Sequence, residues 1–488
     1  MKKKRLQILV IGALFLSACL CSLPVPVPLT SPVIPPVTGT PTVLPPTDIY
    51  PDQGAYGLGD PFYPMLGNGG YDVLNYDITL NVHMDENTIN GSTIIMVLAR
   101  ENLAAFNLDF YGMNILLVQV NNINAQYLRR GTELTIIPTA ALKDGDQFEV
   151  RVDYEGTPQQ VPDPSLAIGE GIGWLDFTSG IYTINEPSGS MSWFPSNNYP
   201  TDKATYTFRV TVENPYVVAA NGLLTSTNAS GISTTYTWEE NRPMASYLAS
   251  VNIAKFNLRT ATGPDGLLIR NYFETSLDEQ AISQYDNLSD MIKFYSDLIA
   301  PYPFEAYGVV VMPEAVGVAM ENQTLSVFGS DMGFEEAIAH ELAHQWFGDS
   351  VTLASWHDIW LNEGFATYLS WLWMEYKEGK DVFKNYVESN YQIAQDMFPP
   401  GNPGPSEVFD GSVYIRGGLA LHALRLIVGD ATFYEILRTY YYRYQFGNAS
   451  TDDFIDVAQE VSGKDLRSFF DAWLYASPIP PLPTPLMP

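Results

Sequence analysis

The chain has 488 residues, of which 46% are hydrophobic and 13% are aromatic, and it carries 25 Lys and Arg residues against 55 Asp and Glu residues. This apolar content is enough for a sizeable core and, by length, for two or three domains, so disorder is not expected. The formal net charge of −30 argues against nucleic acid as a partner, because binding phosphate needs a basic surface. The acidity either keeps the surface solvated or attracts cationic substrates, such as peptides with a free amine.

The first residues have the features of an export signal. The basic residues Lys2–Arg5 precede an apolar run, Leu6–Leu16, that is too short for a comfortable membrane span. The run ends in Leu16-Ser17-Ala18-Cys19, which resembles the bacterial lipobox, where a signal peptidase cuts before a cysteine that carries a lipid. An ordinary signal peptide with a chance cysteine, or an uncleaved anchor, is the alternative. The sequence therefore predicts a signal peptide over residues 1–18 and an extracytoplasmic protein anchored to the cell membrane through Cys19.

A proline-rich segment follows the predicted anchor. Cys19 and Cys21 are the only cysteines, so no disulfide and no cysteine ligand is expected in the folded body. Proline recurs densely up to Pro64, and this excludes regular helix and central strand. Residues 19–64 are therefore predicted to be an extended tether that holds the body on the order of 100 Å from a membrane.

The next part of the chain has the two-residue period of β-strands. Apolar side chains alternate with polar ones in Tyr76-Asp-Ile-Thr-Leu-Asn-Val82, and again from Tyr206 to Val212. Asn90-Gly91 and Asn221-Gly222 are expected to form tight turns. The sequence predicts an N-terminal β-rich domain, a sandwich or a saddle, over residues 65–258.

After Leu258 the hydrophobic period becomes helical, and residues 259–478 are predicted to be a mainly helical domain, followed by a proline-rich tail over 479–488. A short strand is expected at Val309–Met312. Helices are expected at Glu279–Leu298, Glu335–Phe347, Asp358–Tyr376, Arg416–Val428, Thr432–Tyr444, Asp452–Glu460 (capped by Ser450 or Thr451) and Asp465–Tyr475. The fold class is therefore α+β with several domains.

The strongest chemical signal is His340-Glu341-Leu342-Ala343-His344, within a predicted buried helix. A spacing of four places both imidazoles on one helical face, where they can share one zinc ion, and Glu341 beside them can accept a proton from water. Two surface histidines that meet this pattern by accident are the alternative. With five histidines in the chain, such an accident is rare.

A catalytic zinc site needs a third protein ligand and one open position. Glu363 lies nineteen positions after His344, on a second predicted helix, and this spacing fits the gluzincin class of metallopeptidases. His357 is the rival ligand, but it stands near the start of that helix and outside the familiar spacing.

These motifs, taken in order, resemble the zinc aminopeptidases related to aminopeptidase N and leukotriene hydrolase. The resemblance runs from Gly67 to Leu474 and covers most of the predicted body. Its landmarks are Trp193-Phe194-Pro195, Asp202-Lys203-Ala204, Ala319-Met320-Glu321-Asn322, the zinc helix, Trp360–Tyr368 and Tyr414 with Arg416-Gly417. The resemblance implies a thermolysin-like catalytic domain with one Zn²⁺ per chain and peptides with a free N-terminus as substrates.

The family also implies roles for individual residues. Glu321, within the substrate-binding element that includes Ala319, Met320 and Asn322, is expected to bind the α-ammonium group of the substrate, for which a carboxylate is the natural partner. Glu186, nine residues before Pro195, is expected to contact the same end of the substrate.

The catalytic roles that the resemblance implies fall on two residues. Tyr414 is expected to donate a hydrogen bond to the oxyanion that forms when water attacks the scissile carbonyl. Glu341 is expected to take the proton from that water and to deliver it to the leaving amine. Cleavage after the first residue is the expected result.

Three departures from the family pattern stand out. Val318 occupies a position where glycine is usual, and Ser370 replaces a glutamate that supports the zinc site in many relatives, so weaker zinc binding is expected. The chain also stops soon after Tyr475, whereas larger relatives continue into a helical C-terminal domain, so a more open cleft is expected. A zinc endopeptidase of the same class and a catalytically silent peptidase scaffold that binds surfaces are the competing interpretations.

Overall fold

The computed structural model describes residues 50, 52–166 and 168–484, and all of its elements belong to one compact unit, Thr47–Pro488. The predicted signal peptide, Cys19, residues 19–49 of the predicted tether and the last four residues of the tail lie outside the described residues. No helix within the described ranges has both the length and the apolar character that a membrane crossing requires.

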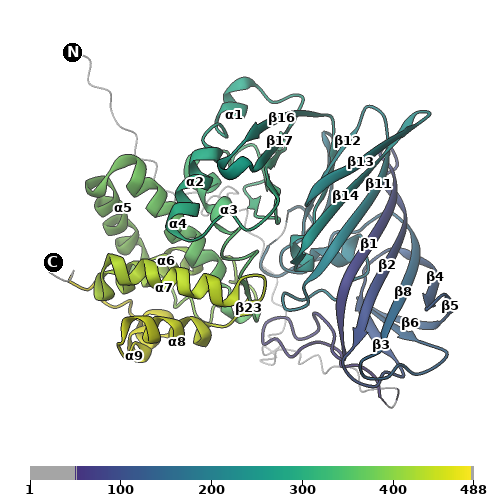
Figure 1. Ribbon diagram of the computed structural model, residues 1–488, viewed down its shortest axis with the longest axis horizontal. Coiled ribbons are helices and arrows are strands. Elements are labelled where there is room, and N and C mark those ends of the chain that lie inside the picture. Colours follow the sequence, from purple (N-terminus) through teal and green to yellow (C-terminus); the bar gives the residue numbers. More distant parts are fainter. Residues whose placement is uncertain (1–49, 51, 167, 485–488) are drawn as a thin grey trace, which may run out of the picture. The chain divides into compact units, whose positions relative to one another are not determined.

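A long eight-stranded sheet dominates the N-terminal half and is drawn in purple to teal in Figure 1. Its strand order is β13-β14-β11-β1-β2-β8-β4-β5. The expected alternation is present, because Tyr76 to Val82 and Tyr206 to Val212 bury every second side chain. The central strands β1 and β11 run parallel, with Tyr76 beside Tyr206. The strands are β1 Tyr71–His83, β2 Thr88–Ala99, β4 Asn114–Val120, β5 Ile123–Asn124, β8 Gln147–Gly156, β11 Ala204–Glu213, β13 Leu223–Ser230 and β14 Ser233–Met244.

One of the two expected turns is wrong. Asn90-Gly91 lies inside strand β2, and the β1–β2 turn is formed instead by residues 84–87, with Asn87 in the left-handed region. Glycine is needed at position 91 for packing, since a β-carbon there would overlap the Tyr154 ring on the neighbouring strand. Asn221-Gly222 does form a sharp bend between β12 and β13, with Gly222 at a φ of 76°, but these strands belong to different sheets and do not form a hairpin.

Two smaller sheets complete this half of the chain. One has the order β3-β7-β6 and the other β12-β15-β10-β9, and the end of β10 leads directly into Asn185 and Glu186. The strands are β3 Phe106–Asp109, β6 Gln126–Arg130, β7 Glu133–Ile137, β9 Gly173–Phe177, β10 Gly180–Ile184, β12 Val217–Ala220 and β15 Val251–Ala254.

A mixed sheet, in the order β16-β17-β19-β21-β20 with β18 paired to β17, opens the second half. The expected short strand is confirmed as β19. The edge strand β20, which pairs with β21, contains Ala319 and Met320 and therefore leads into the predicted ammonium-binding residue Glu321. The strands are β16 Phe256–Thr262, β17 Leu268–Glu274, β18 Ala306–Tyr307, β19 Val309–Val311, β20 Ala319–Met320 and β21 Ser326–Phe328; a separate pair joins β22 Thr352–Leu353 to β23 Asn448–Ala449.

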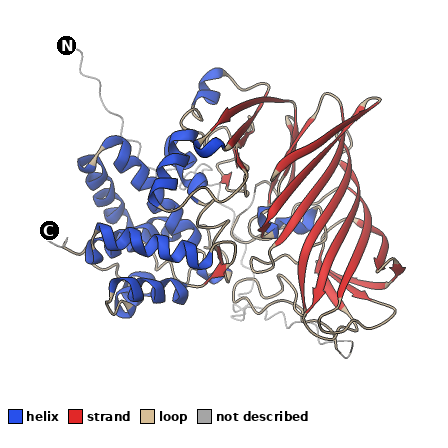
Figure 2. Cartoon of the chain, viewed as in Figure 1, coloured by secondary structure: helices blue, strands red, loops and turns tan. Residues whose placement is uncertain are grey.

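Helices make up most of the remainder, and Figure 2 shows how strands and helices segregate between the two halves of the chain. They are α1 Glu279–Ser283, α2 Leu288–Leu298, α3 Glu335–Ala343, α4 Trp360–Glu378, α5 Lys380–Ile393, α6 Gly411–Val428, α7 Asp430–Tyr444, α8 Thr451–Ser462 and α9 Arg467–Phe470. An N-terminal β-sheet domain followed by a helical catalytic domain is the predicted α+β class, and the prediction is confirmed.

Several helix boundaries differ from the predictions. The first helix is broken at residues 284–287, the zinc helix ends at Ala343 rather than Phe347, and the last predicted helix is α9 followed by a π turn at Asp471–Tyr475. Ser450, and not Thr451, caps α8 through a reciprocal capping box with Asp453. Helix α5 is absent from the predictions.

Helices α4 and α6 cross at a pair of glycines. A β-carbon on Gly364 would lie 2.9 Å from the Gly417 backbone, so only glycine permits this close approach. Arg416 on α6 is fully buried, and its guanidinium donates hydrogen bonds to the carbonyls of Met397 and Trp473. The crossing places Tyr414 and Glu363 on neighbouring helices close to the same site.

The segment immediately before β1 packs against the body, although it lies in the range 19–64 predicted as tether. Asp60 is buried, and its carboxylate accepts hydrogen bonds from Tyr199, from Ser355 and from the Trp356 backbone, each at 2.8 Å. Gln53 forms a bridge with Ala105. Residues 53–64 therefore join the sheet half to the helical half, and the domain boundaries drawn from the sequence stay predictions.

Candidate active site

Helix α3 carries the two histidines of the predicted zinc site. Glu335 and Glu336 occupy its first turn, where negative charge favours the helix N-terminus, and its buried face packs Ile338 and Leu342 into the core. The spacing of four brings the His340 and His344 rings together, with ring centroids 4.7 Å apart.

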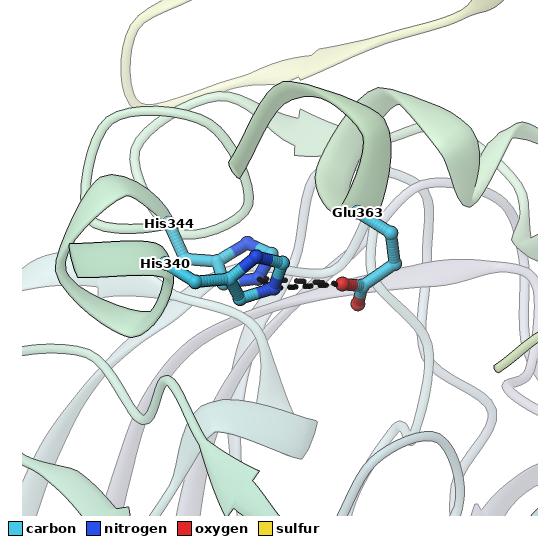
Figure 3. Close-up of side chains that lie close together, drawn as sticks. All are labelled: His340, His344 and Glu363. Atoms are coloured by element: carbon cyan, nitrogen blue, oxygen red, sulfur yellow. Dashed lines mark hydrogen bonds and ion pairs between the residues drawn. The ribbon is translucent and has the colours of Figure 1, made fainter. Parts of the chain in front are cut away.

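Glu363, from the first turn of α4, completes a triad with these histidines, as Figure 3 shows. The two Nε2 atoms are 3.0 Å apart, and Glu363 Oε2 lies 3.2 Å from His340 Nε2 and 3.5 Å from His344 Nε2. Ligand atoms about 2.1 Å from a tetrahedral zinc ion are separated by roughly 3.4 Å, so this triangle fits zinc. Two imidazole nitrogens and a carboxylate oxygen that face one another also repel unless a cation or a proton lies between them. The donor set is that of a catalytic zinc site with an open fourth position.

The second nitrogen of each imidazole has its own partner. His344 Nδ1 lies 3.1 Å from the Phe347 carbonyl oxygen, and His340 Nδ1 lies 3.4 Å from the Thr367 hydroxyl. A hydrogen on Nδ1 leaves Nε2 with a free lone pair that points at the metal position. Ser370, which was expected to give the site weaker support, donates a hydrogen bond to the Thr367 carbonyl.

His357 does not join the site. It lies in the 3₁₀ turn Trp356–Asp358, half-buried beside Phe62, with Nδ1 4.0 Å from the Asp358 carboxylate. Within the described ranges, the groups of side chains able to hold a metal do not include it. The rival ligand is therefore rejected, because His357 lies in the turn before α4 and belongs to none of these groups.

Carboxylates surround the triad. Glu341 and Glu321 lie with His344 in one group whose ligand atoms are all within 4.8 Å of one another. Burial alone would lower the pKa of His344, but the charges of Glu321, Glu363 and Glu341 raise it to about 10. Burial raises the pKa of Glu341 well above its usual range, and the neighbouring carboxylates raise it further. The site therefore favours any bound cation.

Glu186 and Glu321 converge with Glu363. The three carboxylates form a second group within 4.8 Å, although Glu186 comes from the loop after β10 and Glu321 from the end of β20. Both side chains are buried, and Glu186 Oε1 and Glu321 Oε1 have no hydrogen-bond partner. Buried carboxylate oxygens without a hydrogen bond are costly unless a ligand satisfies them, and an ammonium group is the natural ligand.

The rest of the predicted substrate-binding element surrounds Glu321. Met320 is buried and Ala319 is half-buried in β20. The side-chain amide of Asn322 is buried and has no hydrogen-bond partner on either atom. These groups lie next to Glu321 in the chain, and their predicted contacts with substrate stay predictions.

Tyr414 lies against the zinc helix. Its ring stacks on the His340 imidazole, with centroids 5.7 Å apart and an interplanar angle of 23°. Burial, with the charges of Glu363 and Glu186, raises its pKa well above the usual value, so the hydroxyl keeps its proton. The hydroxyl is a hydrogen-bond donor at the edge of the site.

Two further parts of the site were not predicted from the sequence. Gln345, the residue after the second histidine, is buried and bonds to the backbone of Glu321. Lys203, from the sheet half, is half-buried and donates to the carbonyls of Asp349 and Ser350 in the turn after α3. Burial lowers the pKa of Lys203 to about 7, and the Asp349 charge opposes that shift. Lys203 belongs to the Asp202-Lys203-Ala204 motif, to which no separate role was assigned. A single glutamine such as Gln345 has no recognisable sequence pattern.

The fold and the site together define a zinc metallopeptidase. Residues 73–248 match the Peptidase M1 N-terminal domain, and residues 283–473 match the Peptidase family M1 domain. The M1 zinc metallopeptidase of Deinococcus radiodurans is 32% identical, with a TM-score of 0.83, over 88% of this chain and 100% of that chain. This chain therefore belongs to the M1 family of zinc metallopeptidases.

Curated relatives are longer than this chain. Aminopeptidase N of Streptomyces lividans is 28% identical over 334 residues, which are 62% of this chain and 38% of the relative. Aminopeptidase N of Lactococcus lactis subsp. cremoris is 27% identical over 433 residues, which are 82% of this chain and 50% of the relative. The chain thus spans half or less of the length of these two relatives.

Proposed function

We propose that this protein is an aminopeptidase that hydrolyses the first peptide bond of peptides with a free N-terminus. The observation that carries the proposal is the convergence of Glu186 and Glu321, each with a buried oxygen that has no hydrogen-bond partner, beside the zinc ligand Glu363. Carboxylates at this place bind an α-ammonium group and so fix the distance from the end of the peptide to the metal. The Deinococcus radiodurans relative has been solved as a mutant bound to a Tyr-Ser-Ala substrate, and a mutant of a two-domain M1 zinc metallopeptidase has been solved with L-arginine; both support the same substrate class.

The reaction follows from the residues around the triad. The chemistry that zinc supplies in such a site is Lewis-acid polarisation of the peptide carbonyl and a lowered pKa of water. Glu341 accepts the proton of the attacking water and then delivers it to the leaving amine. Tyr414 donates a hydrogen bond to the oxygen on which negative charge develops. Glu186 and Glu321 hold the ammonium group while Asn322, Met320 and Ala319 line the approach.

Glu321→Ala tests the proposal. Aminoacyl fluorogenic amides and N-acetylated peptides are assayed with wild type and variant, with and without a zinc chelator. The proposal expects chelator-sensitive release of single residues from free ends only, and kcat/KM lower by about 10²-fold or more in the variant, because a buried charge pair is lost. Internal cleavage of acetylated peptides identifies an endopeptidase instead. No cleavage by protein that contains zinc identifies a silent scaffold.

We also propose that the protein is an extracytoplasmic lipoprotein. The support is the basic and apolar leader ending in Leu16-Ser17-Ala18-Cys19, followed by the proline-rich segment. Expression of the full chain in bacteria with a radiolabelled fatty acid tests it. Label and membrane association are expected for wild type and are expected to be lost with Cys19→Ser; label retained in that variant would refute the assignment.

A further inference from the structure

The segment that carries Glu321 is fixed through its main chain. Between β20 and β21, the Glu321 carbonyl accepts a hydrogen bond from Gln345 Nε2 at 2.8 Å, and the Thr324 N–H donates to Gln345 Oε1 at 2.9 Å. The Gln323 carbonyl accepts from Asn221 Nδ2 at 2.7 Å. One side chain therefore holds both ends of the four-residue segment 321–324.

The amide of Gln345 is completely used. Besides these two bonds, Oε1 accepts from the Tyr302 hydroxyl at 2.9 Å and Nε2 donates to Asp349 Oδ2 at 2.7 Å. Gln345 has no exposed surface, and it directly follows the zinc-binding His344. Four bonds with different partners leave this side chain a single orientation.

The segment needs this support for two reasons. Thr324 has a φ of 67°, in the left-handed region that a β-branched residue rarely adopts, so surrounding contacts must hold it there. In addition, Glu321 Oε1 has no hydrogen-bond partner and has only a 4.0 Å ion-pair contact with His344 Nδ1, so the position of this carboxylate depends mainly on where its backbone is held. The end of α3 and the ammonium-binding carboxylate are linked through one amide.

We propose that Gln345 is a positioning residue for recognition of the free amino group. It fixes the distance between Glu321 and the zinc ligands His340 and His344, which lie just before Gln345 in the chain. The inference rests on the proposed aminopeptidase function. On the far side of Gln345, Asp349 lies in a turn whose carbonyls accept hydrogen bonds from Lys203. The sheet half thus supports the same network.

A matched pair of inhibitors isolates this role. Alanine hydroxamate and propanohydroxamate carry the same zinc-binding group and differ only in the α-amine, so the ratio of their inhibition constants reports ammonium recognition alone. For Gln345→Met, which keeps length and removes all four hydrogen bonds, the ratio is expected to fall about tenfold. Zinc content and the inhibition constant of propanohydroxamate are expected to stay within about twofold of wild type.

Further variants guard against a general loss of structure. Gln345→Glu keeps the side-chain volume but has no N–H for the Glu321 carbonyl, so the same fall is expected if the Met variant does not fold. In a Glu321→Gln background, Gln345→Met should have no further effect on the ratio, because it acts through Glu321. Thr93→Val removes a buried hydrogen bond to Tyr154 in the large sheet and serves as the control that leaves the ratio unchanged.

The outcomes separate the two proposals. Wild-type enzyme that does not prefer alanine hydroxamate overturns both the aminopeptidase function and the role of Gln345. Wild-type preference that persists in both Gln345 variants overturns only the role of Gln345. A parallel rise of both inhibition constants, with loss of zinc, also overturns it, because Gln345 would then support the metal site rather than the carboxylate.

Discussion

Tyr414→Phe isolates the proposed oxyanion contact, because the substitution removes little else. The ring stacks on His340 and keeps that contact as phenylalanine. The hydroxyl makes no hydrogen bond with any residue in the described part of the chain, so no bond of the free enzyme is broken. Any large effect must therefore come from a bond that forms with the reacting substrate.

The expected loss follows from that difference. Removing one oxyanion donor costs about 10²–10³ in kcat, or roughly 3–4 kcal/mol of transition-state stabilisation. KM should change little, and the free energy of unfolding should stay within about 0.5 kcal/mol of wild type. Because burial and nearby carboxylates raise the pKa of Tyr414, its hydroxyl remains a donor and the alkaline limb of the rate profile should be the same in both enzymes.

Steady-state kinetics on a dipeptide amide, zinc analysis and chemical denaturation test these expectations together. Tyr154→Phe is the matched control, since its hydroxyl contacts Thr93 in the large sheet; this variant should lose about 1 kcal/mol of stability with kcat unchanged. A kcat for Tyr414→Phe within threefold of wild type would refute the oxyanion role. A fall in kcat that is matched by lost zinc or lost stability would show a structural role instead.

Three further predictions concern the base, the zinc site and the sheet half. Glu341→Gln should lower kcat by about 10²–10⁴ while zinc analysis still finds one ion per chain; a smaller loss would assign the proton transfer elsewhere. Thr367→Val, which removes the hydroxyl beside His340 Nδ1, should weaken zinc binding about tenfold in a competition with a chelator, and unchanged affinity would show that the 3.4 Å contact does not orient the ring. Glu133 and Asp109 face each other on β7 and β3, and burial, then the Asp109 charge, raises the pKa of Glu133 to about 9. The folded protein keeps this proton while the unfolded chain loses it, so stability falls as pH rises from about 5 to 9; Glu133→Gln should flatten that dependence in urea denaturation, and an unaltered slope would contradict it.

The parts of the site that sequence reasoning predicted are those set by covalent spacing. His340 and His344 share a helical face because they are four residues apart, and Glu363 lies on the next long helix in a position that the family spacing indicates. The strands β1 and β11 could be predicted equally well, because a strand with one buried face has an apolar residue at every second position. Local pattern and tertiary structure agree at these places.

Other features depend on partners that are distant in the chain. Asn90-Gly91 has the composition of a turn, but its glycine is required by the Tyr154 ring of another strand. Helix α5 was missed because it buries only Phe383 and Val387 and leaves a mostly polar surface. Gln345 gave no signal either, since its four partners come from positions 302, 321, 324 and 349.

The charges of the site suggest why binding and catalysis belong together. Glu186, Glu321, Glu341 and Glu363 bring four carboxylates into one buried region, and close, desolvated charges of one sign are unstable without counterions. A divalent zinc ion and a peptide ammonium group together contribute three positive charges, so one carboxylate stays unbalanced. Among these four side chains, the one that neither ligates the metal nor binds the ammonium is Glu341. With both cations bound, the negative charge left on Glu341 is what a general base needs, and it is removed when Glu341 accepts the proton from water. Binding of the ammonium group should therefore stabilise the transition state and also determine which peptide bond is cleaved. A substrate without its α-amine should then have a lower kcat as well as a lower affinity.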